Sequence, residues 1–345
     1  MKVGILTGGG DCPGLNAVIR AVVRRGQHHG FSCVGLLDGW KGLVDNLTMP
    51  LDLHTTSGIL HVGGTILGTS RTNPFKKAES VDKVLATLKK NDLGALIAIG
   101  GEDTLGVAKR LFEEKQVKVV GVPKTIDNDL SGTDFTFGFD TAVQIATEAI
   151  DRLHTTAASH HRVIVCEVMG RHAGWIATYA GLAGGADVTL VPEFPFELDK
   201  VVGHLKHRHA QGKKFSIVVT AEGATLATPK GEENVTLSGQ KDEFGHVQLG
   251  GIGQFLATEI EKRTGFETRA TVLGHIQRGG SPSAHDRVLA TRFGVKAADM
   301  VAAGEFGRMA ALRGNDVQSV ALAEATAQLK TVDPAFYALA ETFFG

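Results

Sequence analysis

Two carboxylates and a hydroxyl follow directly on an apolar run in the first half of the chain. The run Val117–Val122 predicts a buried strand, and residues 123–129 then read Pro-Lys-Thr-Ile-Asp-Asn-Asp. Ligands of open parallel sheets bind beyond the carboxyl ends of strands, so we expect these side chains at a binding site. Asp127 is a candidate general base, and Asp129 is a candidate ligand for Mg²⁺, which favours carboxylates and substrate phosphates. The alternative for this spacing alone is an Asx-rich turn without a function.

Two glycine-rich turns follow other predicted strands. Gly8–Gly10 opens one helical segment, and Gly100–Thr104 opens another. Backbone N–H groups at such helix starts bind phosphate. For the first turn, a dinucleotide site is the alternative, because Asp38 ends the second predicted strand, although the glycine spacing is one residue off the dinucleotide fingerprint. These two glycine turns and the acidic turn at residues 123–129, each at the end of a predicted strand, together indicate a phosphate-binding site.

Cationic and hydrogen-bonding side chains recur near the ends of other predicted strands. Gly63–Ser70 mimics a nucleotide P-loop but has Thr69 where that motif needs lysine. The further candidates are Arg71, Arg162, the run Met169-Gly170-Arg171, Glu222, Arg269 and the run His275-Ile276-Gln277-Arg278. Because guanidinium groups match phosphate geometry, these residues favour an anionic ligand, with solvated surface arginines as the alternative.

The composition narrows the class of protein. A chain of 345 residues predicts roughly two domains of ~100–200 residues each. The net charge of −1 provides no basic surface for nucleic acid or an acidic membrane, so an anionic ligand must be bound locally. No apolar run approaches the ~20 residues of a membrane span. Cys12, Cys33 and Cys166 lack metal-ligand spacing, and we expect a reduced, cytoplasmic protein.

Short apolar runs alternate with amphipathic segments, which predicts an α/β fold with mostly parallel sheets. The predicted strands are Val3–Leu6, Ser32–Leu37, Ala95–Ile99, Val117–Val122, Val163–Val168, Val188–Val191, Ile217–Val219 and Thr268–Leu273. Leu15, Val18 and Val22 share one helical face, and a helix after Thr141-x-x-Gln144 is predicted to begin with a capping box. The polar segment Thr225–Gly250 predicts a lid or insertion, or else a long surface hairpin.

Taken together, six segments resemble the 6-phosphofructokinase family, in particular its pyrophosphate-dependent bacterial members. They are Gly8–Asn16, Gly68–Arg71, Gly100–Thr104, Pro123–Asp129, Met169–Arg171 and Gly274–Pro282. The resemblance implies two doubly wound, mostly parallel-sheet domains with the active site in the cleft between them. A phosphoryl-donor domain is expected over residues 1–138 plus about 278–330. A fructose 6-phosphate domain is expected over 139–277 plus about 331–345.

The same resemblance implies roles for individual residues in phosphoryl transfer to the 1-hydroxyl of fructose 6-phosphate. Asp127 takes the hydroxyl proton, and Thr125 positions the transferring group. The remaining assignments are Gly9, Gly10 and Arg71 for the donor, Glu102 and Asp129 for Mg²⁺, Ile126, Met169, Gly170, Arg171 and Glu222 for the sugar, and Arg162, Arg269, His275 and Arg278 for its 6-phosphate. The family more usually has Asp where Glu102 stands.

The resemblance also implies a homo-oligomer, dimer or tetramer, because the residues matching Arg162 and Arg269 reach into a neighbouring subunit's site. Arg20, Arg24, Lys213 and Lys214 match an effector site of ATP-using relatives. At other positions of that site Leu53 and His154 replace arginines, and Asp187 replaces a glutamate. We therefore expect little or no allosteric response.

The phosphoryl donor depends on two positions where ATP-using relatives typically have glycine. Asp103 would occupy and repel the α-phosphate of ATP, and Lys124 would supply a cation to pyrophosphate. The pair predicts a pyrophosphate-dependent, reversible phosphofructokinase. An ATP-dependent enzyme is the alternative, as is a non-catalytic subunit that senses sugar phosphate. For Asp103 alone, a solvent-facing acid at a helix N-terminus is also possible.

Overall fold

The computed structural model describes residues 1–228, 231–234, 236–241 and 247–344, and its contacts divide the chain into two compact units. The first unit contains Met1–Ile126, Leu130–Thr141 and Arg278–Leu329. The second contains Asp127–Asp129, Ala142–Gln277 and Lys330–Gly345. The chain therefore passes between the units several times, and two of these crossings flank the three residues Asp127–Asp129.

The first unit is built on a seven-stranded sheet with the order β15-β14-β5-β4-β1-β2-β3. Strands β14, β5, β4, β1 and β2 are parallel, whereas the edge strands β15 and β3 pair antiparallel with their neighbours. The strands are β1 (Lys2–Thr7), β2 (Ser32–Leu36), β3 (Thr48–Leu51), β4 (Leu93–Gly100), β5 (Val119–Pro123), β14 (Arg308–Arg313) and β15 (Asp316–Ala321).

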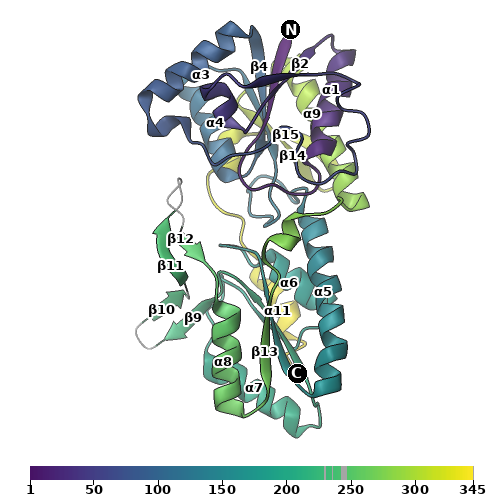
Figure 1. The fold of residues 1–345 in the computed structure, drawn as a ribbon, viewed down its shortest axis with the longest axis vertical. Coiled ribbons are helices and arrows are strands. Elements are labelled where there is room, and N and C mark those ends of the chain that lie inside the picture. Colours follow the sequence, from purple (N-terminus) through teal and green to yellow (C-terminus); the bar gives the residue numbers. More distant parts are fainter. Residues whose placement is uncertain (229–230, 235, 242–246, 345) are drawn as a thin grey trace. The chain divides into compact units, whose positions relative to one another are not determined.

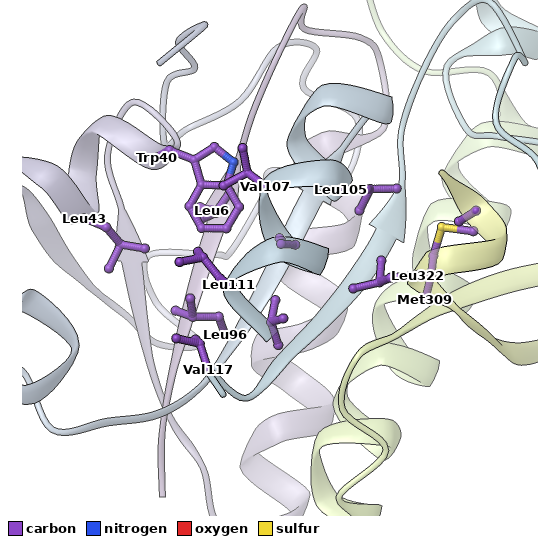
Figure 2. Close-up of a cluster of buried hydrophobic side chains, with 14 of the residues drawn as sticks. Leu6, Trp40, Leu43, Leu96, Leu105, Val107, Leu111, Val117, Met309 and Leu322 are labelled. Carbon is purple, nitrogen blue, oxygen red and sulfur yellow. The ribbon is translucent and has the colours of Figure 1, made fainter. Parts of the chain in front are cut away.

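Helices cover both faces of this sheet (Figure 1). Helices α1 and α9 pack against each other on one face. On the other face, α2, α3, α4 and α10 enclose a core that includes Leu6, Trp40, Leu96, Leu105 and Met309 (Figure 2). These helices are α1 (Leu15–His28), α2 (Trp40–Val44), α3 (Ala78–Lys90), α4 (Glu102–Lys115), α9 (Ala284–Ala303) and α10 (Leu322–Ala325), with a 3₁₀ turn η1 (Pro74–Lys76) before α3. The face of α1 formed by Leu15, Val18 and Val22 is buried, as its spacing predicted.

The second unit is built on a parallel four-stranded sheet with the order β13-β6-β8-β7. Its strands are β6 (Val163–Val168), β7 (Val188–Leu190), β8 (Ser216–Ala221) and β13 (Thr268–Val272). Helices α7 and α8 cover one face, where a core includes Val165, Leu190, Leu205, Val218 and Leu256. Helices α5, α6 and α11 lie on the other face (Figure 1). These helices are α5 (Phe139–His160), α6 (Trp175–Ala183), α7 (Leu198–Ala210), α8 (Ile252–Thr264) and α11 (Pro334–Glu341), and a 3₁₀ turn η2 (Gly274–Arg278) follows β13.

The predicted α/β class with mostly parallel sheets is confirmed, and every predicted strand is present within a few residues of its expected bounds. Continuous apolar runs identify such strands because both faces of a parallel sheet are buried. In the part of the chain that the structure describes, no helix combines the length and the apolar character needed to cross a membrane.

The predicted capping box at Thr141 is wrong. Helix α5 already begins at Phe139, so Thr141 lies inside its first turn. The Thr141 hydroxyl donates to the buried Asp286 carboxylate at 2.5 Å, and the Thr141 backbone N–H donates to the same oxygen at 2.9 Å. A carboxylate from α9, 145 residues away, thus satisfies an N–H group that the local motif was expected to satisfy.

The polar segment Thr225–Gly250 contains two short antiparallel ladders, which favours the hairpin alternative over its described part. Strand β9 (Thr225–Thr228) pairs with β10 (Gly231–Asn234), and β11 (Thr236–Lys241) pairs with β12 (Val247–Leu249). The rest of the predicted lid, at 229–230, 235 and 242–246, lies outside the described residues.

Candidate active site

The turns that follow β1, β4 and β5 begin side by side at one edge of the sheet in the first unit. Strands β5, β4 and β1 are parallel neighbours, and Gly100 of β4 pairs with Pro123 of β5. Gly8 donates its N–H to the carbonyl of Ile99 at 2.9 Å, and Lys124 donates its N–H to that of Gly100 at 3.0 Å. In the sheet, β1 lies between β2, the next strand in the sequence, and β4. The Gly8–Gly10 turn at the end of β1 therefore lies at a topological switch point, where doubly wound folds bind ligands.

Two cationic side chains converge on this turn. The side chain of Lys124 is buried, and its Nζ donates to the carbonyl of Gly10. The guanidinium of Arg278 donates to the carbonyl of Asp11 at 3.3 Å. A Cβ atom on Gly10 would lie 2.7 Å from Nη1 of Arg278, whereas one on Gly9 would lie 3.5 Å from Nζ of Lys124. The missing side chain of Gly10 therefore lets the Arg278 guanidinium approach the backbone, whereas the distance at Gly9 is an ordinary contact.

The turn after β4 brings acidic residues to the same edge of the sheet. Glu102 and Asp103 form the first turn of α4, where the helix dipole favours carboxylates. Glu102 is exposed and Asp103 is half-buried. The buried Thr104 fills the space beside the glycine turn, because a Cβ atom on Gly8 would lie 2.5 Å from its hydroxyl oxygen. The glycines of both turns thus allow α4 to begin close to the Gly8–Gly10 backbone.

The segment before Arg71 is fastened to the same glycine turn. Thr69 donates its hydroxyl to the carbonyl of Gly9 at 2.6 Å, and Gly9 donates its N–H to the carbonyl of Ser70 at 3.3 Å. Arg71 itself is exposed. An arginine with a fixed backbone and an exposed side chain at the glycine turn is suited to contact an anion there.

The loop after β5 carries the predicted base. Thr125 and Ile126 are buried in the first unit, and the Thr125 carbonyl accepts a 2.8 Å hydrogen bond from the Thr136 hydroxyl. Asp127 and Asp129 are half-buried and belong to the second unit together with the buried Asn128 between them. The loop therefore changes units between Ile126 and Asp127.

A second set of turns lies at the carboxyl ends of three neighbouring strands in the second unit. Met169–Arg171 follows β6, Glu222 follows β8, and His275 lies in the turn after β13. The Glu222 N–H donates to the carbonyl of Val168 at 2.8 Å, so the β6 and β8 turns are adjacent. Gly170 has a φ of 127°, which an L-residue rarely adopts. Met169 and Gly170 are buried, Arg171 and Glu222 are half-buried, and His275 is exposed.

Arg162 and Arg269 lie at the opposite, amino-terminal ends of the same strands. Arg162 precedes β6, and Arg269 is the second residue of β13. Both guanidiniums pair with Glu267, at 2.7 Å from Arg162 and 2.6 Å from Arg269. The hydrogen bond from Arg162, followed by the charges of both arginines, lowers the pKa of Glu267. Within one chain, these arginines are therefore not brought together with Met169, Glu222 and His275.

The residues of the expected effector site make internal contacts. Asp187 forms an ion pair with Arg208 at 2.6 Å and accepts a 2.8 Å hydrogen bond from the Ile217 N–H. Burial raises the pKa of the Asp187 carboxyl, and the Ile217 N–H and Arg208 oppose this shift. The imidazole Nε2 of His154 lies 2.6 Å from the carbonyl of Gly184. The carboxylate at 187 thus already has an intramolecular cationic partner.

The three cysteines are free and buried, and burial raises the pKa of Cys12 to about 12. A thiol that stays protonated at neutral pH is not a nucleophile, so the thiol of Cys12, next to the glycine turn, does not supply covalent chemistry. Among the described residues, no group of three or more His, Cys, Asp or Glu side chains is arranged to hold a metal ion.

Two residues without a sequence-based role contact the candidate site. Gln277 is fully buried, and its Oε1 accepts a 2.8 Å hydrogen bond from the N–H of Met169. Lys330 donates its backbone N–H to the carbonyl of Asp129 at 2.8 Å. Gln277 belongs to the run His275-Ile276-Gln277-Arg278, which the sequence indicates as a candidate for anion binding. Lys330, by contrast, is 201 residues from Asp129 in the sequence, and no local pattern marks it.

Known proteins are similar to this chain over its whole length. The family described as Phosphofructokinase matches residues 2–301. A protein of Amycolatopsis methanolica named pyrophosphate–fructose 6-phosphate 1-phosphotransferase is 62% identical over 347 residues, which cover 100% of both chains. A protein of Streptomyces coelicolor named ATP-dependent 6-phosphofructokinase 3 is 53% identical over 342 residues, 99% of both. The crystal structure of a pyrophosphate-dependent phosphofructokinase from Marinobacter aquaeolei shares the fold, with a TM-score of 0.82 at 23% identity over 96% of this chain and 85% of that one.

Proposed function

The chain belongs to the phosphofructokinase family, and from this premise we propose that it transfers a phosphoryl group reversibly from pyrophosphate to the 1-hydroxyl of fructose 6-phosphate. Membership alone does not select the donor, because full-length relatives carry both pyrophosphate and ATP in their names. Three relatives named for pyrophosphate are 60–62% identical, whereas a fourth, at 52%, is no more similar to this chain than the relatives named for ATP, at 53%.

The observation that carries the choice of donor is the pair Lys124 and Asp103, in the turns after β5 and β4, since Lys124 alone does not discriminate between the two donors. The ammonium group of Lys124 is buried and donates to the carbonyl of Gly10, inside the turn proposed to hold the donor. Pyrophosphate lacks the ribose and adenine that give ATP additional contacts, so a donor site for pyrophosphate needs cations close to the phosphates. Lys124 supplies such a cation.

Asp103 is proposed to exclude ATP from the same site. Asp103 lies half-buried in the first turn of α4. The residue before that turn, Gly101, lies close to the turn that carries Lys124, because a Cβ atom on Gly101 would be 3.4 Å from the Lys124 carbonyl oxygen. A carboxylate and an α-phosphate about 4 Å apart at an effective dielectric constant near 20 repel each other by ~4 kcal/mol, which is about a thousandfold in binding. A repulsion of this size is enough to favour pyrophosphate.

The chemical roles follow from what phosphoryl transfer requires. The protein mainly positions the reactants and neutralises charge. We assign Asp127 as the base that accepts the sugar hydroxyl proton. Thr125 and Arg171 are assigned to position and neutralise the transferring group, and Gly9, Gly10 and Arg71 to hold the donor.

Phosphotransferases of this family generally use a divalent metal ion. We propose Mg²⁺, with Glu102 and Asp129 as its protein ligands. The residues fit this ion, because Mg²⁺ is usually held by one or two carboxylates, with substrate phosphates and water as the other ligands. Such a site needs no cluster of three protein side chains. When bound, the ion neutralises the charge that develops on the phosphoryl oxygens.

The sugar phosphate is assigned to the turns of the second unit and to Arg278. Ile126, Met169, Gly170, Arg171 and Glu222 are proposed to hold the sugar, and His275 and Arg278 its 6-phosphate. Arg162 and Arg269 lie at the far end of the strands, which supports the proposal that they serve the site of a neighbouring subunit in a dimer or tetramer.

An aldolase-coupled assay tests this proposal. The purified chain is given Mg²⁺ and fructose 6-phosphate, with pyrophosphate or ATP supplied in turn. We expect fructose 1,6-bisphosphate with pyrophosphate and little with ATP. Turnover with ATP but none with pyrophosphate would identify an ATP-dependent enzyme. No turnover with either donor would favour a sugar-phosphate sensor. The presence of Asp127, Asp129, Arg171 and Arg278 favours an enzyme.

A further inference from the structure

Lys330 joins the loop that carries the proposed base to the body of the second unit. It is the first residue after the last crossing from the first unit. Its backbone N–H donates to the carbonyl of Asp129 at 2.8 Å, and its Nζ donates to Oδ1 of Asn128 at 3.0 Å. One lysine therefore contacts two of the three residues Asp127–Asp129 through both its backbone and its side chain.

Asn128, the partner of the lysine side chain, has an unusual backbone conformation. Its φ is 52°, in the left-handed region that non-glycine residues seldom adopt, and its exposed fraction is 2%. Such a conformation costs free energy and persists where surrounding contacts fix it, often at functional sites. The hydrogen bond to a cationic lysine is one of these contacts, and Asn128 lies between Asp127 and Asp129 in the sequence.

Lys330 is itself held by the second unit. Its carbonyl accepts a 2.9 Å hydrogen bond from Nε1 of Trp175, the first residue of α6, and its Nζ lies 5.6 Å from the centre of the Trp175 ring. Two residues farther on, Val332 donates its N–H to Glu193 at 2.9 Å, and the same carboxylate accepts from the N–H of Gly174. The contacts of the lysine therefore lead to the start of α6 in the sheet-and-helix body of this unit.

We infer that Lys330 is a positioning residue, which acts through Asn128 to fix the Asp127 carboxylate in the second unit. The chain attaches the loop to β5 of the first unit, but residues 127–129 belong to the second unit by their contacts. Lys330 supplies two of those contacts. The base then keeps a constant position relative to the Met169 and Glu222 turns of its own unit. This inference rests on the proposed function, because it assigns Asp127 the role of base.

Three variants test the inference: Lys330→Met, Asn128→Gly and the double variant. Methionine keeps most of the stem that lies near Trp175 and removes the ammonium, whereas glycine keeps the left-handed backbone and removes the amide. A small misplacement of a reacting group costs roughly 10²-fold, so each single variant should lose about that factor in kcat. The KM for fructose 6-phosphate should stay nearly constant. The double variant should be no slower than the slower single variant, because both changes remove one interaction.

The matched control is Lys200→Met in the same unit. Lys200 is exposed and pairs with Glu197 at 2.8 Å on the surface, so its loss should leave kcat unchanged. Lys330→Arg restores a cation and should recover part of the kcat lost in Lys330→Met. A kcat of Lys330→Met within about threefold of the wild type would overturn the inference, as would a double variant that loses the product of both factors.

Hydrogen exchange followed by mass spectrometry gives a readout that does not depend on activity. Lys330→Met should raise exchange in peptides that cover 126–131 and leave peptides from β8 unchanged. Unchanged exchange at 126–131 would overturn the inference even if the wild type turned over no substrate. An inactive wild type with faster exchange in the variant would instead refute the proposed function alone. Should Lys330→Met fail to fold, the kcat and KM of Asn128→Gly test the inference instead. A loss of about 10²-fold in kcat at nearly constant KM would support it, and an unchanged kcat would overturn it.

Discussion

Replacing Lys124 by methionine tests the proposed donor site, because methionine keeps the volume of the stem and removes the buried cation. The lysine donates to the Gly10 carbonyl, and only 4% of its surface is exposed. A charge-assisted hydrogen bond contributes ~1.5–3 kcal/mol, or about 10- to 150-fold. The full attraction between unit charges about 4 Å apart at a dielectric constant near 20 is ~4 kcal/mol, or about a thousandfold. Because the free enzyme already bears the cost of burying the ammonium, we expect a loss of roughly 10²-fold in kcat/KM for pyrophosphate.

The assay is the aldolase-coupled rate at saturating fructose 6-phosphate with varied pyrophosphate. In a second series, with pyrophosphate saturating and fructose 6-phosphate varied, the KM for the sugar should be unaffected, because the lysine contacts the donor turn. Lys118→Met in the same unit is the matched control, since Lys118 is exposed and its Nζ lies over the ring of Phe306 at 5.7 Å. Thermal unfolding of both variants shows whether the lost Gly10 contact destabilises the fold. A kcat/KM for pyrophosphate within about threefold of the control would refute the assignment of Lys124.

Three further predictions follow from the same site. Asp103→Gly should open the site to ATP and lower the preference for pyrophosphate over ATP at least about tenfold, measured as the ratio of the two kcat/KM values; an unchanged ratio would show that Asp103 does not exclude ATP. Asp127→Ser should lower kcat by about 10²–10⁴-fold without weakening sugar binding, and near-wild-type turnover would reject Asp127 as the base. Millimolar ADP or phosphoenolpyruvate should not shift the half-saturation for fructose 6-phosphate, because Asp187 is paired with Arg208 at 2.6 Å and Leu53 and His154 lack guanidinium groups; a clear shift would contradict this.

Much of the fold could be predicted from the sequence, because the strands of a parallel sheet are buried on both faces. Val163–Val168 is apolar at almost every position, and β6 has these same bounds. The turns at the ends of β1, β4 and β5 could also be predicted, since their glycines and carboxylates follow directly on such runs. The sequence order of these turns and the rule for parallel sheets were sufficient to place them at one edge.

Contacts between distant segments could not be predicted in this way. Thr141 appeared to begin a helix with a local cap, but the carboxylate of Asp286 from α9 binds its N–H instead. Lys330 contacts Asn128 and Asp129 from the far end of the chain, and a lysine in a polar stretch has no periodicity that marks it. The guanidinium of Arg278 contacts the Asp11 carbonyl, 267 residues away in the sequence, and its role at the sugar phosphate stays a prediction. Each case depends on a side chain that reaches across the fold, which local patterns do not encode.

The measurement that tests the choice of donor most directly is ³¹P NMR of the reverse reaction. The purified chain is incubated with Mg²⁺, fructose 1,6-bisphosphate and either inorganic phosphate or ADP. The free energy of hydrolysis of pyrophosphate is close to that of the sugar phosphate ester that it forms. Inorganic phosphate should therefore accept the 1-phosphoryl group and a pyrophosphate resonance should appear, whereas ADP should yield no ATP. The appearance of ATP from ADP, with no pyrophosphate formed from phosphate, would contradict the account.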